Sequence, residues 1–439
     1  MSKAKKSGRA LAIQVLGEIL QEKAYGNITL RKALKGSSSP MENAFITEIV
    51  TLTLRNLILI DYIINGFTKT PISGINPFIR DLLRISVCQL RFLAKTPDHA
   101  AVNEAVELAK NNGFRNLAGF VNGVLRSIAR NPNKPILPLE SLMNPESLAL
   151  IYSYPVWMVR EIIKWLGEER ALSFFRQSHT PPSMIVHVNT TKTTPEVLTE
   201  QFEADGITVR EVAPVDGMES VFPFLSISRF GDISSLASFK KGLFFVMDPG
   251  GAMAVEALDP KPNQVVYDMA AAPGGKSFAI ACQMENKGLL KAFDIHPHRV
   301  ELIRSSKRRL ELGIIEPIVH DVLVPKPTLE KTADAVLLDA PCSGLGTLRK
   351  HPEMKYTRSY EDIVSLAVKQ KVMLSASGKY VKPGGKLIYC TCTISPMENE
   401  EVVEDFLTKH QEFSLMSNRL THPGDTNDGF FTATFIRCD

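Results

Sequence analysis

The chain has 439 residues, of which 44% are hydrophobic and 22% charged, and a formal net charge of +4. These proportions fit a globular protein of two or three domains and exclude both a disordered chain and a single small domain. The charge is unevenly divided, because residues 1–140 carry 19 lysines and arginines against 10 acidic residues, while the remainder carries 32 against 37. A basic third joined to a mildly acidic body suggests a domain that binds a polyanion and a domain that acts on it, although a solvated basic face gives the same numbers.

The cysteine pattern and the hydropathy indicate the kind of protein and its cellular compartment. The six cysteines form no C-x-x-C pair and no cysteine–histidine spacing typical of zinc, so neither a disulfide framework nor a metal site is predicted. The longest apolar stretch, residues 46–67, is interrupted by charged residues, and residues 1–20 have the pattern of an amphipathic helix. The sequence therefore predicts a cytoplasmic protein without a membrane segment.

The N-terminal third predicts an all-helical domain. From Arg9 to about Arg130 apolar residues recur at helical spacing, and the alternation typical of strands is scarce. Three prolines within residues 131–138 then indicate a domain boundary near residue 140. Residues 141–238 predict a small α+β subdomain, with helices within 145–177 and at 195–204 and strands at 184–188 and 207–212.

Residues 239–439 alternate between apolar strands and helical stretches, which predicts a doubly wound parallel α/β sheet. In such sheets ligands bind at the carboxyl ends of the strands, so the residues that follow each strand are the candidates for chemistry. The expected strands lie at 244–247, 265–267, 289–293, 315–319, 335–338 and 386–389.

A loop of small residues follows the strand at 265–267 and opens a helix, where backbone N–H groups can approach a ligand closely. The loop fits a relaxed phosphate-binding pattern, which makes a P-loop nucleotidase one alternative. However, Asp294 and Asp321 follow the next two strands, where carboxylates can bind a ribose diol and an adenine amino group. The three features together favour an adenosine-containing cofactor without phosphates, and S-adenosylmethionine fits. The loop residues are Ala270, Ala271, Ala272, Pro273, Gly274, Gly275 and Lys276.

Two further strand ends carry thiols. Asp339 and Cys342 follow the strand at 335–338, and Cys392 follows the strand at 386–389. A lone cysteine is more often a small buried residue, but two beside an acid match methylation of a pyrimidine. A thiolate added at carbon 6 makes carbon 5 nucleophilic toward a methyl sulfonium, and Asp339 at the cytosine N3/N4 edge stabilises the developing charge. Spacing does not decide which cysteine attacks.

A cluster of cations lies close to the same edge in the sequence. Arg349, Lys350, His351 and Lys355 are predicted to contact an RNA backbone, with Tyr356 available for stacking on a base. An ordinary solvated surface loop is the alternative interpretation.

These motifs resemble those of a known family. D-x-x-A-A-P-G-G-K, D-A-P-C-S-G-x-G and T-C-T followed by E-N-E are similar to the motifs of RNA cytosine-C5 methyltransferases of the RsmB (Sun/Fmu) type. The N-terminal third resembles the NusB-like RNA-binding domain of that type through residues 89–93, 98–106 and 120–126, and D-G-F-F at 428–431 fits the family ending. The resemblance covers nearly the whole chain.

The resemblance implies a class I S-adenosylmethionine-dependent methyltransferase domain over 239–439 behind a NusB-like domain over 1–140. It implies methylation of 16S rRNA at cytosine 967. We also expect a monomer that holds no metal. Cys392 maps to the nucleophile and Cys342 to the residue that assists product release. A non-catalytic RNA-binding assembly factor is the alternative. Two departures from the family pattern are Ala270, where a cysteine is frequent, and His187, where an arginine is frequent.

Overall fold

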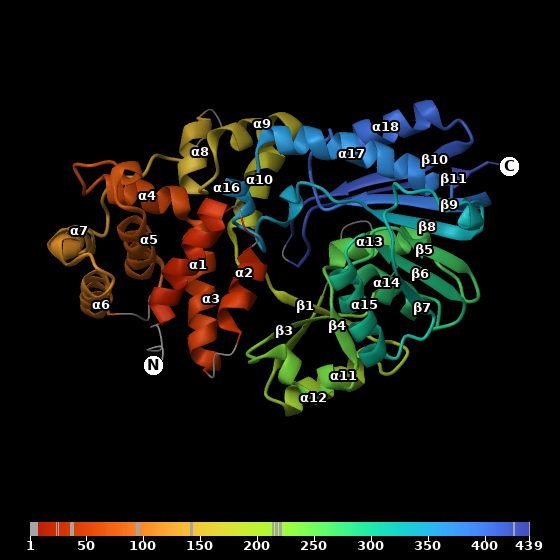
Figure 1. The fold of residues 1–439 in the computed structure, drawn as a ribbon, viewed down its shortest axis with the longest axis horizontal. Helices are drawn as coiled ribbons and strands as arrows, with labels where there is room; N and C mark the ends of the chain where they lie inside the picture. The colour runs from red at the N-terminus through yellow and green to blue at the C-terminus, as the bar shows by residue number, and fades with distance from the viewer. Residues whose placement is uncertain are drawn as a thin grey trace. The chain divides into compact units, whose positions relative to one another are not determined.

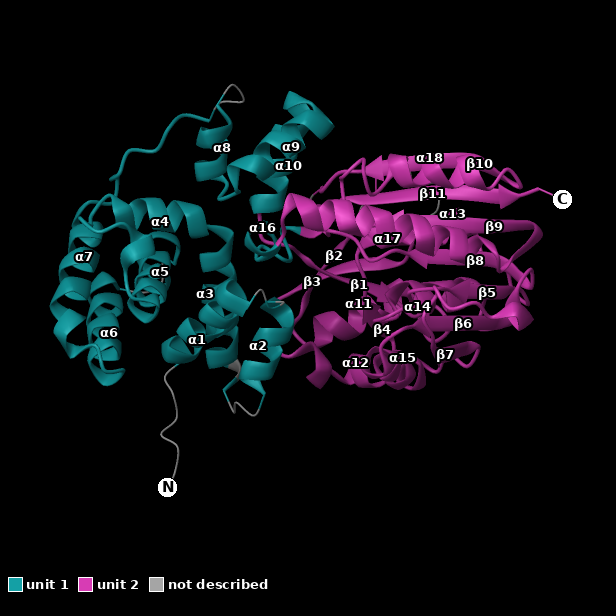
Figure 2. Cartoon of the chain, turned by 45° about the horizontal axis from the view of Figure 1, so that its top comes forward, with its two compact units in different colours: residues 1–179, 348–357 teal, residues 180–347, 358–439 magenta. Residues whose placement is uncertain are grey.

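The computed structural model describes residues 8–22, 24, 26–35, 39–93, 97–140, 144–212, 215, 218, 222–424 and 426–438 (Figure 1). The chain divides into two compact units. Unit 1 comprises residues 1–179 and 348–357, and unit 2 comprises residues 180–347 and 358–439 (Figure 2).

Unit 1 is helical, which confirms the prediction from apolar spacing. Val15, Leu16 and Ile19 of α1 pack with Ile49 of α3 and Leu83 of α5 in one hydrophobic core. Residues 131–140, after α7, have no regular secondary structure, and α8, α9 and α10 belong to this unit. The helices are α1 (Gly8–Glu22), α2 (Gly26–Leu34), α3 (Pro40–Arg55), α4 (Leu57–Asn65), α5 (Pro77–Phe92), α6 (Asp98–Asn111), α7 (Ala118–Arg130), α8 (Pro145–Ile151), α9 (Val156–Leu166), α10 (Glu168–His179) and α16 (Met354–Thr357).

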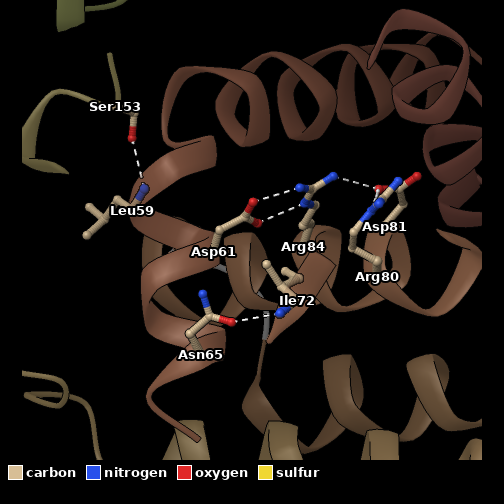
Figure 3. A network of polar contacts seen from close by, with 8 residues as sticks. All are labelled: Leu59, Asp61, Asn65, Ile72, Arg80, Asp81, Arg84 and Ser153. Carbon is tan, nitrogen blue, oxygen red and sulfur yellow. Dashed lines mark hydrogen bonds and ion pairs between the residues drawn. The ribbon is translucent and has the colours of Figure 1, made fainter. Parts of the chain in front are cut away.

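A polar network joins α4 to α5 inside unit 1 (Figure 3). Arg84 donates two hydrogen bonds to the Asp61 carboxylate, at 2.8 and 2.6 Å, and one to Asp81 at 2.9 Å. Burial raises the pKa of Asp81 above its usual value even though Arg84 and Arg80 lower it. Because one guanidinium serves two carboxylates, the buried charges are paired rather than isolated.

Among the described residues, no single helix is long and apolar enough to span a membrane. Helices α3 (from Met41) and α4, bent by 74° at their junction, reach that length and composition only as a pair.

Unit 2 begins with a four-stranded sheet in the order β2-β3-β1-β4. Strands β1 and β2 and helix α11 confirm the α+β prediction, whereas the sequence pattern did not identify β3. The prediction that residues 244–247 belong to the parallel sheet is wrong, since β4 pairs antiparallel with β1. Hydrophobicity identifies a strand but does not specify its partner. The elements are β1 (Met184–Val188), α11 (Pro195–Ala204), β2 (Thr208–Glu211), β3 (Phe224–Ser228), α12 (Ala237–Lys240) and β4 (Phe244–Val246).

The rest of unit 2 is a seven-stranded sheet in the order β10-β11-β9-β8-β5-β6-β7. Its strands β5 to β9 pair in parallel, whereas β10 and β11 form an antiparallel edge. Its elements are α13 (Pro249–Leu258), β5 (Val265–Asp268), α14 (Gly275–Gln283), β6 (Leu289–Asp294), α15 (Pro297–Leu310), β7 (Ile315–Val319), β8 (Ala333–Asp339), α17 (Tyr360–Gly378), β9 (Val381–Thr391), α18 (Glu400–Lys409), β10 (Phe413–Thr421) and β11 (Phe430–Arg437).

Alternate residues of the central strands face opposite sides of this sheet. Leu337 and Ile388 join the core beneath α13, α14 and α15, while their neighbours Leu338 and Tyr389 join the core beneath α17 and α18. Both faces are thus covered by helices, which confirms the predicted doubly wound architecture (Figure 1). The chain runs from β5 outward to β7 and then returns to β8 on the other side of β5, so a topological switch point lies between β5 and β8.

Candidate functional site

The cofactor loop predicted from sequence connects β5 to α14 at this switch point. Backbone N–H of Ala271 donates to Phe293 O of β6 at 2.7 Å, which fixes the loop to the neighbouring strand. Gly274 has a φ of +114°, and a Cβ at this position would overlap the Phe278 ring. Only glycine fits there, so the backbone itself requires the first glycine of the G-G pair.

Lys276, the last residue of that loop, is paired with an acid from another strand. Its Nζ lies 2.6 Å from Oδ2 of Asp339 at the end of β8, and 4.7 Å from the centre of the Phe430 ring. Burial alone would lower the pKa of Lys276, but the charge of Asp339 and its hydrogen bond to Lys276 raise that pKa above its usual value. The ammonium group therefore stays charged beside Asp339.

The two cysteines that the sequence singled out meet at the same edge of the sheet. Cys342 lies in the loop after β8 and Cys392 directly follows β9, and their Sγ atoms are 3.3 Å apart. Cys390, near the end of β9, also donates from its Sγ to Asp339 Oδ1 at 3.5 Å. The carboxyl ends of β5, β8 and β9 thus bring together the Lys276–Asp339 pair and both thiols.

A cavity of about 220 Å³ opens at this edge. Asp268, at the end of β5, forms part of its wall and accepts a hydrogen bond from Ser277 Oγ at 2.6 Å. Burial raises the pKa of Asp268 to about 7, and the nearby charge of Asp339 adds to that shift. The cavity is lined by Val246, Met247, Asp248, Gly251, Asp268, Ala271, Pro273, Gly275, Lys276, Asp339, Thr347, Cys392, Asp428 and Phe430.

Asp248, Asp428 and Phe430 are cavity residues that the sequence did not assign to the site. Backbone N–H of Asp428 donates to Asp248 Oδ1 at 3.0 Å, so the two acids are held next to each other. Gly346 connects this region to the thiols, because its N–H donates to Cys392 O and its carbonyl accepts from Gly429 N–H, each at 2.9 Å. The D-G-F-F motif, which contains Asp428 and Phe430, was the signal that could have identified these two residues. The sequence analysis noted its resemblance to the family ending but assigned it no role.

The other two predicted cofactor acids do not line this cavity. Asp294, at the end of β6, accepts a hydrogen bond from His296 N–H and pairs with Arg299 at 3.3 Å. Arg299 also donates to Ala272 O at 2.5 Å, which joins Asp294 to the cofactor loop. Asp321, after β7, accepts from Leu323 N–H at 2.9 Å. Both acids lie at strand ends as predicted. Asp294 ends β6, the neighbour of β5, and Asp321 follows β7, the next strand outward.

The cations predicted to contact RNA lie in the segment 348–357, which belongs to unit 1. Arg349 and Lys355 are only 2% and 3% exposed. Lys355 Nζ donates to the carbonyls of Arg55 (2.9 Å) and Tyr152 (3.1 Å), and Tyr356 OH donates to Ser153 O. The prediction that Arg349 and Lys355 present their charges to RNA is therefore wrong, because these side chains are packed inside the protein; Lys350 and His351 are partly exposed.

His187, the departure from the family pattern in β1, is a core residue. Its ring stacks on Phe245 with centroids 4.7 Å apart and contacts Phe224 edge to face. Burial lowers the pKa of His187 to about 4, so the ring is neutral at pH 7. An aromatic environment of this kind accommodates a neutral imidazole in place of a cation.

The seven-stranded sheet with a ligand-sized cavity at its switch point has the fold of S-adenosylmethionine-dependent methyltransferases. Three families match the chain in order. Residues 6–130 match the NusB family, residues 154–217 match an RsmF/B-like ferredoxin-like domain, and residues 255–436 match the family described as 16S rRNA methyltransferase RsmB/F.

Individual relatives extend over almost the whole chain. Probable ribosomal RNA small subunit methyltransferase B of Bacillus subtilis is 38% identical over 412 residues, which cover 93% of this chain and 90% of the relative. The protein of the same name from Synechocystis is 32% identical, covering 96% and 94%. The crystal structure of PH0851 matches 99% of this chain and 100% of its own, with a TM-score of 0.81 and 28% identity. The chain belongs to the RsmB/F family of 16S rRNA methyltransferases.

Proposed function

We propose that the protein transfers a methyl group from S-adenosylmethionine to carbon 5 of a cytosine in 16S rRNA, at position 967 by family resemblance, through a covalent adduct of Cys392 to carbon 6. The relatives' names support a small-subunit rRNA substrate. The observation that carries the proposal is the 3.3 Å separation of the Cys342 and Cys392 sulfurs beside Asp339.

The two thiols have different proposed roles. The pKa of Cys342 is raised well above its usual value by its hydrogen bond with Cys392 and by burial. The Cys342–Cys392 contact lets one thiol donate a hydrogen bond to the other, which stabilises negative charge on the accepting sulfur. The family resemblance assigns the attacking thiolate to Cys392. By the same resemblance Cys342, once deprotonated, assists removal of the C5 proton and release of the product.

Asp339 is the proposed contact to the target cytosine. Its Oδ2 accepts from Lys276 and its Oδ1 accepts from Cys390, so both oxygens are held in place. A carboxyl group fixed in this way can bond to the N3/N4 edge of the base without rearranging. Because Lys276 stays charged, it stabilises negative charge on Asp339 and on the adjacent thiolate.

The cavity fits S-adenosylmethionine better than a nucleotide with phosphates. Four acids line it, Asp248, Asp268, Asp339 and Asp428, against a single cation, Lys276, that is already paired with Asp339. Such a lining matches a sulfonium cation and repels a polyphosphate, which argues against the P-loop alternative. When bound, the cofactor supplies an electrophilic methyl group. Asp294 and Asp321 remain the proposed contacts to ribose and adenine, and Arg299 must then share the Asp294 carboxylate.

RNA binding is assigned to unit 1 through its NusB family match. Of the predicted RNA contacts, Lys350 and His351 are retained as candidates because their side chains are partly exposed. Arg349 and Lys355 are excluded by their burial.

Incubation with labelled S-adenosylmethionine and unmodified 16S rRNA tests the proposal. We expect label on carbon 5 of a single cytosine. Label on adenine, guanine or ribose contradicts the assignment, and RNA binding without any methyl transfer favours the assembly-factor alternative.

The cysteine roles are tested by the adducts that variants form. Cys392→Ala is expected to form no covalent RNA complex, whereas Cys342→Ala should trap one that survives a denaturing gel. The exposed Cys438→Ala variant is the matched control and should resemble the wild type. The opposite pattern for Cys392 and Cys342 would show that their roles are exchanged.

A further inference from the structure

A buried polar network lies behind the two thiols. At its centre Glu398, whose side chain is fully buried, accepts hydrogen bonds from Ser343 N–H (2.8 Å), from Ser343 Oγ and from Gln370 Nε2 (3.0 Å). Ser343 directly follows Cys342 in the chain. Gln370 of α17 also donates to Pro341 O at 2.9 Å, so the residues on both sides of Cys342 are held.

The neighbouring residue Asn399 holds the other thiol in the same manner. Its Oδ1 accepts from Thr391 Oγ1 at 2.6 Å, and its Nδ2 donates to Thr393 O at 3.0 Å. Thr391 and Thr393 flank Cys392. In addition, the hydroxyl oxygens of Ser343 and Thr393 are 2.8 Å apart, which joins the two cysteine loops directly.

The network holds the residues on both sides of each cysteine and leaves the two sulfurs outside it. Its six side chains are 0% exposed: Ser343, Gln370, Thr391, Thr393, Glu398 and Asn399. Cys342 and Cys392, in contrast, are only partly buried. Buried hydrogen bonds of this kind are stiff, because losing one partner leaves the other unsatisfied in a low-dielectric interior.

We propose that Glu398 and Asn399 are positioning residues that set the separation of the Cys342 and Cys392 sulfurs, so that both thiols reach the same base in successive steps. The inference rests on the proposed function for its consequence in turnover, but the separation itself is a property of the protein alone. It gives a physical role to the E-N-E motif, which the sequence comparison matched without explanation.

A thiol-closure assay tests the separation without RNA or cofactor. In a Cys438→Ser background, dithiodipyridine forms a mixed disulfide with one active-site thiol. The second thiol then displaces the reagent's remaining half, so two thiols are oxidised as one dipyridyl disulfide is reduced to two pyridinethiones. We expect rapid closure to a Cys342–Cys392 disulfide in the otherwise unchanged protein, confirmed by mass spectrometry.

Glu398→Gln, which keeps the side-chain size but replaces one acceptor oxygen by a donor, should slow this closure by about tenfold, and Glu398→Ala by about 100-fold. Ser343→Ala removes a single hydroxyl group and replaces the Glu398 variants in the assay if these fail to fold. We expect it to slow disulfide closure severalfold. Glu401→Gln, an exposed acid on the adjoining helix α18, is the matched control and should close at the original rate. Unchanged closure rates in folded Glu398→Ala or Ser343→Ala protein overturn the inference.

Turnover on 16S rRNA provides the second readout. Glu398→Gln should lower kcat by about 100-fold with KM for RNA nearly unchanged, because misplaced thiols affect chemistry rather than binding. A rise in KM with an unchanged kcat overturns the positioning role. If the parent protein does not methylate cytosine, the proposed function fails while the closure rates still decide the positioning inference.

Discussion

Each unit contains a lysine that is largely shielded from solvent, and the two lysines differ in their partners. Lys276 of unit 2 pairs with the Asp339 carboxyl at 2.6 Å, and its pKa is raised despite burial. Lys355 of unit 1 donates to two backbone carbonyls and lies 4.6 Å from the Tyr154 ring centre. Burial and the charge of Arg55 lower the pKa of Lys355 well below its usual value.

The contrast shows why a cation in a sequence does not by itself identify a functional site. A carboxyl partner keeps Lys276 charged at the edge of a cavity, where it can act on a ligand. Carbonyl partners satisfy the donors of Lys355 without compensating its charge, so that side chain serves to hold the segment 348–357 inside unit 1.

The largest expected effect is on catalysis. Lys276→Met should reduce single-turnover methyl transfer by about 1000-fold, since it removes the positive charge beside Asp339 and the thiols. Lys287→Met, a lysine that is 60% exposed, is the control and should be unaffected. A reduction smaller than about tenfold would contradict the assigned role of Lys276.

The second effect is on stability. Lys355→Met should lower the free energy of unfolding by about 2 kcal/mol, because it removes the buried donor that the carbonyls of Arg55 and Tyr152 share. Lys164→Met, 73% exposed, is the control for chemical denaturation. The salt dependence of rRNA binding should stay unchanged, whereas loss of a true phosphate contact would reduce its slope by about 1. A reduced slope would restore Lys355 as an RNA contact.

The smallest expected effect is on the pH dependence of stability, to which the two lysines contribute with opposite signs. Since the folded pKa of Lys355 lies below its unfolded value of 10.5, the unfolded state binds more protons between those pKa values, and stability rises with pH there. For Lys276 the folded pKa is higher, so its stabilisation is complete below 10.5 and is lost only at higher pH. Chemical denaturation at pH 8 and pH 10 measures this effect. The increase in the free energy of unfolding between the two pH values should be smaller in Lys355→Met than in the wild type, and unchanged in Lys276→Met. An equal pH dependence of the free energy of unfolding in the two variants would contradict the proposed difference between Lys355 and Lys276.

The candidate site was predictable to the extent that it lies at strand ends. Asp339, Cys342 and Cys392 were identified because each follows an apolar strand, and parallel strands deliver their carboxyl ends to one edge. The structure places these three together with Lys276. Asp248 and Asp428 escaped notice because Asp248 caps α13 after a short strand of another sheet and Asp428 lies in the loop before β11. Only folding brings the two to the cavity.

The amino-acid sequence by itself determined the helical N-terminal region, the doubly wound sheet and the motifs at its ligand edge, because these depend on periodicity and local spacing. Only the tertiary structure decided which cations are buried, how Glu398 and Asn399 join the two cysteine loops, and that β4 belongs to the small sheet. These properties depend on partners distant in the chain: Lys355 looks like a surface cation in its local sequence, and the carbonyls of Arg55 and Tyr152 that enclose it lie 300 and 203 residues away.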